Sequence, residues 1–235
     1  MERIDKIISS QTNYSRKDVK KLILQKKISV NGKVAKKPEQ KVDEQQDEIY
    51  IDGNKFEIKK YIYLILNKPQ GYISATEDRT AKTVLDLVPE KYMRRGLFPA
   101  GRLDKDTTGM MIITDDGEFA HNILAPKKHI EKTYRVQIDI DITDEMREKF
   151  KQGIVLKDHV CCPATIVVED KNTALITIKE GKYHQIKRMF GCFGAKVVNL
   201  HRISMGGLQL PKNLREGECR ELAAEELEKV CKRDK

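Results

Sequence analysis

Residues 98–117 read FPAGRLDKDTTGMMIITDDG, a short polar loop followed by an apolar run. The run Met110–Ile113 has the length of a buried strand rather than that of a helix. The loop before it holds Asp104 and Asp106, and loops fixed by a strand are common places for reactive side chains. We therefore expect a buried strand that carries a carboxylate-bearing loop at its start.

Spacing alone leaves several interpretations of this loop. From Asp104 the acidic residues have nearly the spacing of a calcium-binding helix-loop-helix, but such a loop needs flanking helices and a Glu at its twelfth position. Here the twelfth residue is Asp115, and the expected strand stands where a helix should be. A glycosidase pair is also disfavoured, because nothing fixes the separation of Asp104 and Asp106. A reactive Asp104 and an ordinary polar turn both remain open.

The chain after residue 60 reads as short strands with a few helices. Strand-sized apolar runs are YIYLIL (61–66), TYRVQIDI (133–140), ATIVVED (164–170) and ALITIKE (174–180). Helical patterns are DEMREKFKQG (144–153), YHQIKRMFGCFG (183–194) and AAEELEKVCK (223–232). Because the strands outnumber the helices and do not alternate regularly with them, we expect an α+β fold rather than a doubly wound parallel sheet.

The first residues read as a small α/β unit of their own. Three isoleucines with helical spacing in RIDKIISS (3–10) predict a first helix, and Ser15 with an acidic residue three positions later predicts the start of a second. The pair Asn31-Gly32 predicts a tight hairpin.

The end of this unit is predicted from the next two stretches. IYIDG (49–53) is expected to be its last strand, and NKFEIKK (54–60) is expected to be a linker. We predict two domains, residues 1–58 and residues 59–235.

Positive charge is concentrated in the first unit. The chain has a net charge of +9, and residues 1–42 hold twelve Lys and Arg against four Asp and Glu. Residues 43–60 hold three against six, and the rest of the chain holds thirty against twenty-six. The basic residues expected on and just after the second helix are Arg16, Lys17, Lys20, Lys21, Lys26 and Lys27. Such a surface suits a polyphosphate partner, although a solubilising lysine-rich face is the alternative.

Composition excludes several other classes of protein. With 39% hydrophobic and 34% charged residues, the chain fits a soluble globular protein. No apolar run is long enough for a membrane span, and the charged start MERIDKIISS does not fit a signal peptide. Five cysteines without a C-x-x-C spacing suggest neither a zinc knuckle nor a redox dithiol. We expect a cytoplasmic protein with no membrane partner and no metal.

Four ordered segments resemble one enzyme family. AGRLDKDTTGMMIITDDG (100–117) resembles the catalytic motif of the RsuA-type pseudouridine synthases, which convert uridine to pseudouridine in ribosomal RNA. LNKPQGYISA (66–75), HIEKTYRV (129–136) and IKEGKYHQIKRMFGCFGAKVVNLHR (178–202) agree with that family in the same order. The N-terminal unit, with its basic helix and VNGKVAKKP (30–38), resembles the S-four RNA-binding domain. The resemblance implies a mainly antiparallel mixed sheet with flanking helices in the second domain.

The resemblance also implies roles in catalysis. Asp104 would be the catalytic carboxylate, acting as a nucleophile on the anomeric carbon or as a base at the neighbouring carbon. Lys187 would be its basic partner, at a position where many relatives carry Arg. Tyr134 would pack on the target base and assist proton movement, and Leu200 would give the pocket an apolar wall. Because the reaction has no redox change and no group donor, no cofactor is expected.

Other residues are expected near the RNA. Arg102 would fill the space left by an extruded uridine or hold a phosphate, and Arg188 would contact the backbone. Lys182 and Arg202 are candidates for the same contact, and all three are weaker candidates than Arg102, since any of them could be a surface charge. His184 is expected to line the pocket or to have a structural role, and it is left out of the catalytic set.

The leading hypothesis is a monomeric synthase that acts on small-subunit (16S) ribosomal RNA or on an assembly intermediate of that subunit. The segment GKYHQIKRMF (181–190) resembles the small-subunit enzymes more than their large-subunit relatives, which are the alternative. A non-catalytic ribosome-assembly factor is an alternative of another class. A nucleosidase that releases uracil is a third, and mass balance of the RNA would distinguish it.

Overall fold

A computed structural model describes residues 1–125 and 128–231, which form two units. The first comprises Met1–Ile62 with Val88–Leu97, and the second comprises Tyr63–Leu87 with the described residues from Phe98 onward. Segment 88–97 belongs with the N-terminal residues because Arg94 donates hydrogen bonds to the Lys59 and Lys60 carbonyls. The boundary between residues 58 and 59 stays a prediction.

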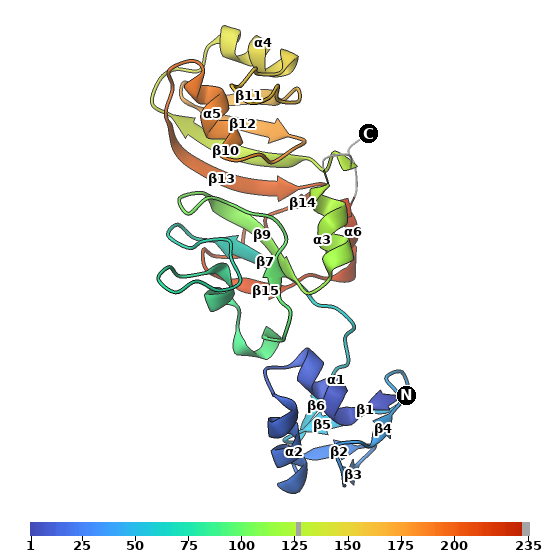
Figure 1. Cartoon of the computed structure of the whole chain (residues 1–235). Helices are drawn as coiled ribbons and strands as arrows, with labels where there is room; N and C mark the ends of the chain where they lie inside the picture. Colours follow the sequence, from blue (N-terminus) through green and yellow to red (C-terminus); the bar gives the residue numbers. More distant parts are fainter. Residues whose placement is uncertain (126–127, 232–235) are drawn as a thin grey trace. The chain divides into compact units, whose positions relative to one another are not determined.

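The first unit packs two helices on a small sheet (Figure 1). The helices are α1 (Ile4–Gln11) and α2 (Arg16–Leu24), and the antiparallel sheet has the order β3 (Lys33–Val34), β2 (Ile28–Val30), β5 (Ile49–Ile51) and β6 (Asn54–Phe56). A short pair, β1 (Glu2–Arg3) and β4 (Lys41–Val42), lies beside them. The core is almost entirely aliphatic: Ile4, Ile7, Ile8, Val19, Ile23, Ile28, Val30, Ala35, Val42 and Ile49.

Local sequence signals explain the start of this unit. The Ser15 hydroxyl accepts a hydrogen bond from the Asp18 N–H at 3.2 Å, and the Asp18 carboxylate accepts one from the Ser15 N–H at 3.0 Å. This reciprocal cap satisfies two donors that the first turn of α2 leaves free. Asn31 and Gly32 have φ values of 50° and 74°, as a tight hairpin between β2 and β3 requires. The predicted helix start and hairpin are confirmed.

The predicted end of the unit is wrong in one respect. Asn54–Phe56 forms β6, which pairs with β5 through Ile51 and Asn54, so NKFEIKK is not a linker throughout and IYIDG is not the last strand. Asp52 and Gly53 have positive φ values of 53° and 80° and form the turn of this hairpin. An Asp-Gly pair is a tight-turn signal of the same kind as Asn-Gly, so the sequence did contain it.

The second unit is built on a long mixed sheet. Its strand order is β11 (Thr165–Asp170), β12 (Thr173–Ile178), β10 (Lys132–Ile138), β13 (Val197–Met205), β9 (Thr108–Thr114), β7 (Tyr63–Lys68) and β15 (Cys219–Glu221). Two short strands extend it, β14 (Leu208–Gln209) on β13 and β8 (Phe98–Pro99) on β9. Neighbours pair antiparallel except β9 and β13, which pair parallel. The predicted α+β class with a mainly antiparallel mixed sheet is confirmed.

The parallel pair β9–β13 joins two halves of the sheet. Gly109 lies opposite Arg202 in the register and has a φ of +100°, and a Cβ built on it would lie 2.3 Å from the Arg202 carbonyl oxygen. Glycine therefore lets the two backbones approach at this point. One residue away, Thr108 Oγ1 and His201 Nδ1 are 2.8 Å apart, and burial lowers the pKa of His201. A neutral imidazole thus completes the junction.

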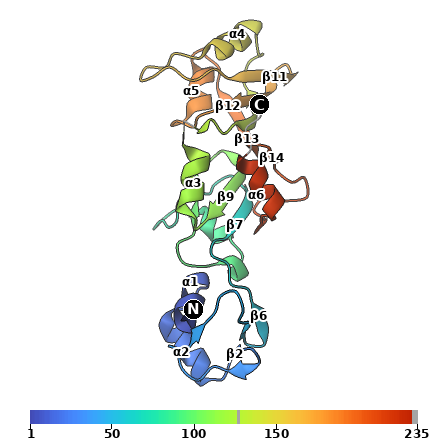
Figure 2. The ribbon, with the colours of Figure 1, turned by 90° about the vertical axis from the view of Figure 1, so that its right-hand side faces the viewer.

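Helices cover the sheet at two places. Helices α3 (Gly117–Leu124) and α6 (Ala224–Cys231) lie beside β9 and β14 (Figures 1 and 2) and contribute Ala120, Ile123 and Val230 to a core shared with β7 and β9. Helices α4 (Asp144–Gln152) and α5 (Gln185–Gly191) lie near β11 and β12 and meet through Phe150 and Phe190, whose ring centroids are 4.9 Å apart. Among the described residues, no helix combines the length and the apolar character needed to cross a bilayer.

Three of these helices were predicted and one was missed. Helix α3 did not figure among the helical patterns, although the Asp116 carboxylate caps it by accepting a hydrogen bond from the Phe119 N–H at 3.0 Å. Helix α5 starts later than its sequence pattern because His184 has a left-handed φ of 47° and serves as the N-cap. The last residue of the predicted C-terminal helix, Lys232, lies outside the described residues.

Candidate active site

The loop between β8 and β9 carries Asp104, and a buried lysine holds the backbone of this loop in place. Lys68, at the end of β7, has no exposed surface. Its ammonium donates to the carbonyls of Thr107 at 2.8 Å, Asp104 at 3.1 Å and Lys105 at 3.4 Å, and also to that of Pro69. Three carbonyl groups of this one loop therefore converge on one positive charge, which defines the position of the Asp104 backbone.

The charge on Lys68 persists despite its burial. Burial lowers the pKa of Lys68 to about 8, and the charges of Asp106 and Asp104 limit that decrease. The ammonium form therefore predominates at neutral pH. On the other side of the loop, the Ser74 hydroxyl donates to the Leu103 carbonyl at 2.8 Å and accepts from the Leu103 N–H at 2.9 Å. The loop is held on both sides of Asp104.

The Asp104 carboxylate faces a lysine from α5. Lys187 Nζ lies 2.9 Å from Asp104 Oδ2 and 2.6 Å from Asp106 Oδ1, so one ammonium bridges two carboxylates. His184 Nε2 is 3.5 Å from Asp104 Oδ1. The Asp104 side chain is 28% exposed and the Lys187 side chain 22%, whereas that of Asp106 is 60% exposed. The Asp104 carboxylate is thus more buried than that of Asp106. A ligand can reach it, but Lys187 shields it from part of the solvent.

Lys187 and Asp106 keep their charges near neutral pH. Burial by itself lowers the pKa of Lys187, but its hydrogen bonds and charge interactions with Asp106 and Asp104 outweigh burial and raise it. Burial by itself raises the pKa of Asp106, yet the hydrogen bond and the charge of Lys187 lower it. The arrangement is an ion-paired group rather than a proton-sharing one.

A short turn positions α5 and with it Lys187. Gln185, 3% exposed, accepts a hydrogen bond from the Lys182 N–H at 3.0 Å and donates one to Glu180 Oε1 at 2.9 Å. These bonds close the turn between β12 and α5. One helical turn after His184, Lys187 then faces the loop of Asp104. The family resemblance suggested Lys187, but not the buried glutamine that orients it.

A pocket opens beside the carboxylate, between the Asp104 loop, β10, β13 and the turn before α5. It is lined by Arg102, Leu103, Asp104, Thr107, Tyr134, Ile178, Gly181, Lys182, His184, Gln185, Ile186, Lys187 and Leu200. Leu200 and Ile178 are buried and supply apolar walls, while charged side chains come from Asp104, Lys187, Arg102 and Lys182. A pocket that combines apolar walls with convergent polar groups is a candidate ligand site.

Tyr134 lines this pocket, and Arg202 lies beside Tyr134 in the sheet. They lie opposite each other on β10 and β13, and Arg202 Nη1 is 3.5 Å from the Tyr134 hydroxyl. The guanidinium carbon lies 6.0 Å from the ring centroid, and Nε donates to the Met110 carbonyl at 2.6 Å. Arg202 is only 2% exposed, so the suggestion that it contacts an RNA backbone is wrong. It supports the tyrosine ring from within the sheet.

The other predicted RNA contacts lie at the surface. Arg102 is exposed at the pocket rim, and within the described chain its guanidinium has no ion-pair partner. Lys182 also lines the pocket, whereas Arg188 points elsewhere and pairs with Asp158. In the first unit Arg16, Lys17, Lys20, Lys21, Lys26 and Lys27 are all exposed, and Lys27 pairs with Asp52 at 3.2 Å. Their binding roles stay predictions.

Sequence reasoning missed Lys68, which fixes the loop, and the contact of Asp106 with Lys187. One signal could have found Lys68. It is a charged residue at the end of the strand-sized run YLILN (63–67), directly before Pro69. A lysine in a buried run is rare unless its ammonium is satisfied by several acceptors.

Family models match most of the chain. The model described as RNA pseudouridylate synthase matches residues 62–191, and the S4 domain model matches residues 2–49. The first match covers the candidate active site from Lys68 to Lys187, and the second covers the basic helix α2.

Individual proteins are similar over nearly their full length. An uncharacterized RNA pseudouridine synthase of Bacillus subtilis (strain 168), YtzG, is 41% identical over 230 residues, which is 96% of each chain. Ribosomal small subunit pseudouridine synthase A of Pasteurella multocida (strain Pm70) is 40% identical over 96% of this chain and 97% of its own. The protein of the same name from Escherichia coli (strain K12) is 38% identical over 97% and 99%. A solved crystal structure of a pseudouridylate synthase matches with a TM-score of 0.69 and 36% identity, over 98% of this chain and 100% of that one.

Proposed function

This chain belongs to the RNA pseudouridylate synthase family, and we propose that it isomerises a specific uridine of small-subunit ribosomal RNA with the Asp104 carboxylate acting at the ribose. The enzyme class follows from family membership: the protein is an RNA pseudouridine synthase of the RsuA type. The observation that carries the residue assignment is the Asp104–Lys187 ion pair in a pocket that also has apolar walls.

The reaction needs an ionised carboxylate next to the sugar. Uracil leaves the anomeric carbon, turns, and is rejoined through its carbon five, so nothing is gained or lost overall. Asp104 acts either as nucleophile on the anomeric carbon or as base at the neighbouring carbon, and both routes start from its charged form. Hydrogen bonds and the charges of Asp106 and Asp104 raise the pKa of Lys187, whose ammonium lies 2.9 Å from the Asp104 carboxylate and so places a positive charge beside it.

The pocket walls suit a flat base. Tyr134 would stack on the uracil during its rotation, and Leu200 would exclude water from the opposite side. Because a stacked uridine cannot reach Asp104, the target must be extruded or already unpaired. Arg102 would hold the phosphate or fill the vacated space, and its exposure at the pocket without an ion-pair partner in the described chain supports this role.

The small-subunit assignment rests on the relatives. The proteins from Pasteurella multocida and Escherichia coli that bear that name match this chain almost from end to end. The test is to incubate the protein with 16S and 23S transcripts and with assembly intermediates of both subunits, and to map pseudouridine by carbodiimide adducts and primer extension. We expect one new site in 16S RNA or its intermediates. New sites confined to large-subunit RNA would contradict the assignment.

Removing the charge of Lys187 is expected to slow the reaction. Lys187→Met should lower the single-turnover rate about 100-fold, because a preorganised charge next to the reacting group is lost. Lys187→Arg should stay within about tenfold of the native rate, since the charge remains. Lys105→Met is the matched control, because Lys105 is exposed in the same loop and makes no ion pair in the described chain. Equal rates for Lys187→Met and Lys105→Met would refute this role.

Basic residues of the first unit are expected to supply salt-dependent RNA affinity. The triple change Lys17→Gln, Lys20→Gln and Lys21→Gln on α2 should reduce the slope of log affinity against log salt by about two, with little change in the rate at saturating RNA. Binding titrations at several salt concentrations measure that slope. Three exposed lysines of the second unit, Lys149, Lys157 and Lys171, changed in the same way, serve as the control. A slope reduced equally by both triple variants would count against the prediction.

A further inference from the structure

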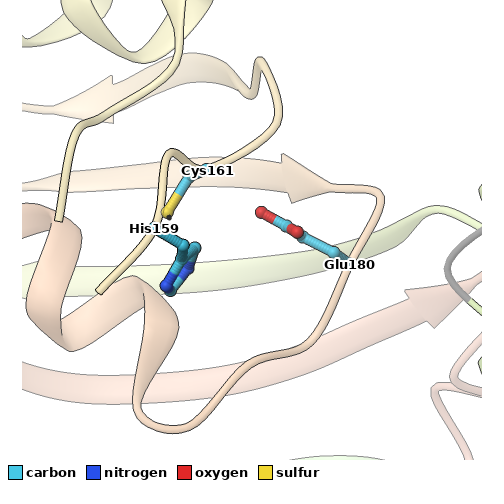
Figure 3. Close-up of side chains that lie close together, drawn as sticks. All are labelled: His159, Cys161 and Glu180. Carbon is cyan, nitrogen blue, oxygen red and sulfur yellow. Dashed lines mark hydrogen bonds between the residues drawn. The ribbon is translucent and has the colours of Figure 1, made fainter.

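Three potential metal ligands lie close together near the turn that leads into α5. The imidazole of His159, the thiol of Cys161 and the carboxylate of Glu180 each offer one atom, and these atoms lie within 4.8 Å of one another. Figure 3 shows the Glu180 carboxylate directed toward Cys161 and His159, which come from the loop before β11. Cys161 is 2% exposed and Glu180 is 8% exposed. The reaction described above uses none of the three.

The distance between two of these atoms fits a zinc site. His159 Nε2 and Cys161 Sγ are 3.6 Å apart. With bond lengths of about 2.3 Å to sulphur and about 2.0 Å to nitrogen, tetrahedral Zn²⁺ places its S and N ligands about 3.6 Å apart. The Glu180 oxygen lies within 4.8 Å of both atoms, so it has to come closer to them to take a third position of the same tetrahedron.

The groups around the ligands have the pattern of an outer shell. His159 Nδ1 lies 3.0 Å from Asp158 Oδ1, so the ring nitrogen that faces away from the thiol is held by a carboxylate. Metal-binding histidines commonly donate their second N–H to such a carboxylate, which leaves the other nitrogen free for the ion. Glu180 is fixed as well, because its Oε1 accepts hydrogen bonds from the Cys162 N–H and from Gln185 Nε2, each at 2.9 Å.

We propose that His159, Cys161 and Glu180 bind one thiophilic divalent ion of the zinc class, with a water molecule in the fourth position. Sulphur and nitrogen ligands select such an ion over Mg²⁺ and Ca²⁺, which prefer oxygen. On binding, a metal–sulphur bond replaces the S–H bond of Cys161, and the proton leaves to solvent. No electron is transferred, and the ion takes no part in the isomerisation.

The ion would stabilise the helix that carries Lys187. Both outer-shell contacts lead to α5, since Gln185 is its first residue and Arg188 pairs with Asp158. Closing the three ligands around one ion therefore ties the loop before β11 and the end of β12 to this helix. Amides of α5 should exchange more slowly with deuterium when the ion is bound.

The test is metal uptake by the full-length native protein without RNA, so its outcome does not depend on the proposed reaction. Protein freed of metal with a chelator is dialysed against Zn²⁺ and counted for bound ion, and Co²⁺ is used as a spectroscopic substitute. We expect one ion per chain, a thiolate-to-cobalt charge-transfer band, tetrahedral visible bands and a higher melting temperature with Zn²⁺. Substoichiometric uptake with an unchanged melting temperature would overturn the proposal.

Variants then identify the ligands. Cys161→Ser should remove the charge-transfer band, and His159→Gln and Glu180→Gln should each weaken binding. Asp158→Asn, which changes only the outer shell, should weaken it about tenfold. Cys192→Ser is the matched control, because Cys192 is an exposed thiol outside the cluster. A charge-transfer band that survives Cys161→Ser, or one that is lost in Cys192→Ser, would also overturn the assignment, and this signal does not require the variants to be active.

Discussion

Asp104→Asn is expected to lower the single-turnover rate of pseudouridine formation by at least about a thousandfold. The amide has nearly the shape of the carboxylate, but it is neither a nucleophile nor a base at neutral pH. The fold should be unaffected, because Lys68 holds Asp104 through its backbone carbonyl rather than through its side chain. Rates measured with enzyme in excess over RNA, together with RNA affinity and the melting temperature, separate chemistry from binding and folding.

Asp106→Asn provides the matched comparison. Asp106 contacts the same ammonium, and its change removes the same charge from the same loop. Its side chain is 60% exposed and Asp106 does not line the pocket, so we expect a rate within about tenfold of the native one. If Asp106→Asn were the inactive variant and Asp104→Asn the active one, the assignment of the catalytic carboxylate would be wrong.

Gly109→Ala should destabilise the second unit by about 3–5 kcal/mol. The new methyl group would lie 2.3 Å from the Arg202 carbonyl oxygen and 2.6 Å from the Arg202 nitrogen, both of them backbone atoms inside a strand. Relief of that contact requires β9 and β13 to separate, which moves the Asp104 loop away from Tyr134. Urea unfolding measures the loss as a lower transition midpoint.

Gly71→Ala separates the steric contact from backbone strain. Gly71 has a similar φ of +92°, but a Cβ there would meet nothing within 4 Å. We expect a loss of only about 1–2 kcal/mol, the cost of a left-handed conformation for alanine. Equal losses of unfolding free energy in Gly109→Ala and Gly71→Ala would mean that the close contact between β9 and β13 contributes nothing to the effect of Gly109→Ala.

Short-range features were predictable from the sequence because local chemistry determines them. The Ser15 cap needs only Asp18 three residues later, and the Asn31-Gly32 hairpin needs only two residues that tolerate positive φ. The runs of alternating or continuous apolar residues gave β7, β10, β11 and β12 close to their observed bounds. The same reasoning should have found the Asp52-Gly53 turn and did not.

Long-range features were not predictable in this way. Nothing local in Val197–Met205 indicates that it pairs with β10 on one side and parallel to β9 on the other. That arrangement depends on Gly109. The need for glycine at this position becomes evident only once Arg202 is known to lie opposite it in the neighbouring strand. Helix α3 was missed because its eight residues, GEFAHNIL, are too few to show a clear period beside the strand that precedes them.

Some features of the candidate site could likewise be predicted from the sequence, and others could not. Resemblance to the family suggested Asp104, Tyr134 and Lys187, and the structure brings all three to one pocket. The burial of Arg202 could not be foreseen, because an arginine beside a motif is more often exposed. Lys68 was missed because its four carbonyl partners belong to a neighbouring turn and to a loop that is distant in sequence.

The most direct test uses small-subunit ribosomal RNA with tritium on carbon five of its uridines. The native protein should release tritium from one site, leave the RNA mass otherwise unchanged, and lose this activity in Asp104→Asn. That result would establish isomerisation dependent on Asp104. Release of free uracil, or equal tritium release by the native protein and Asp104→Asn, would contradict the proposed chemistry.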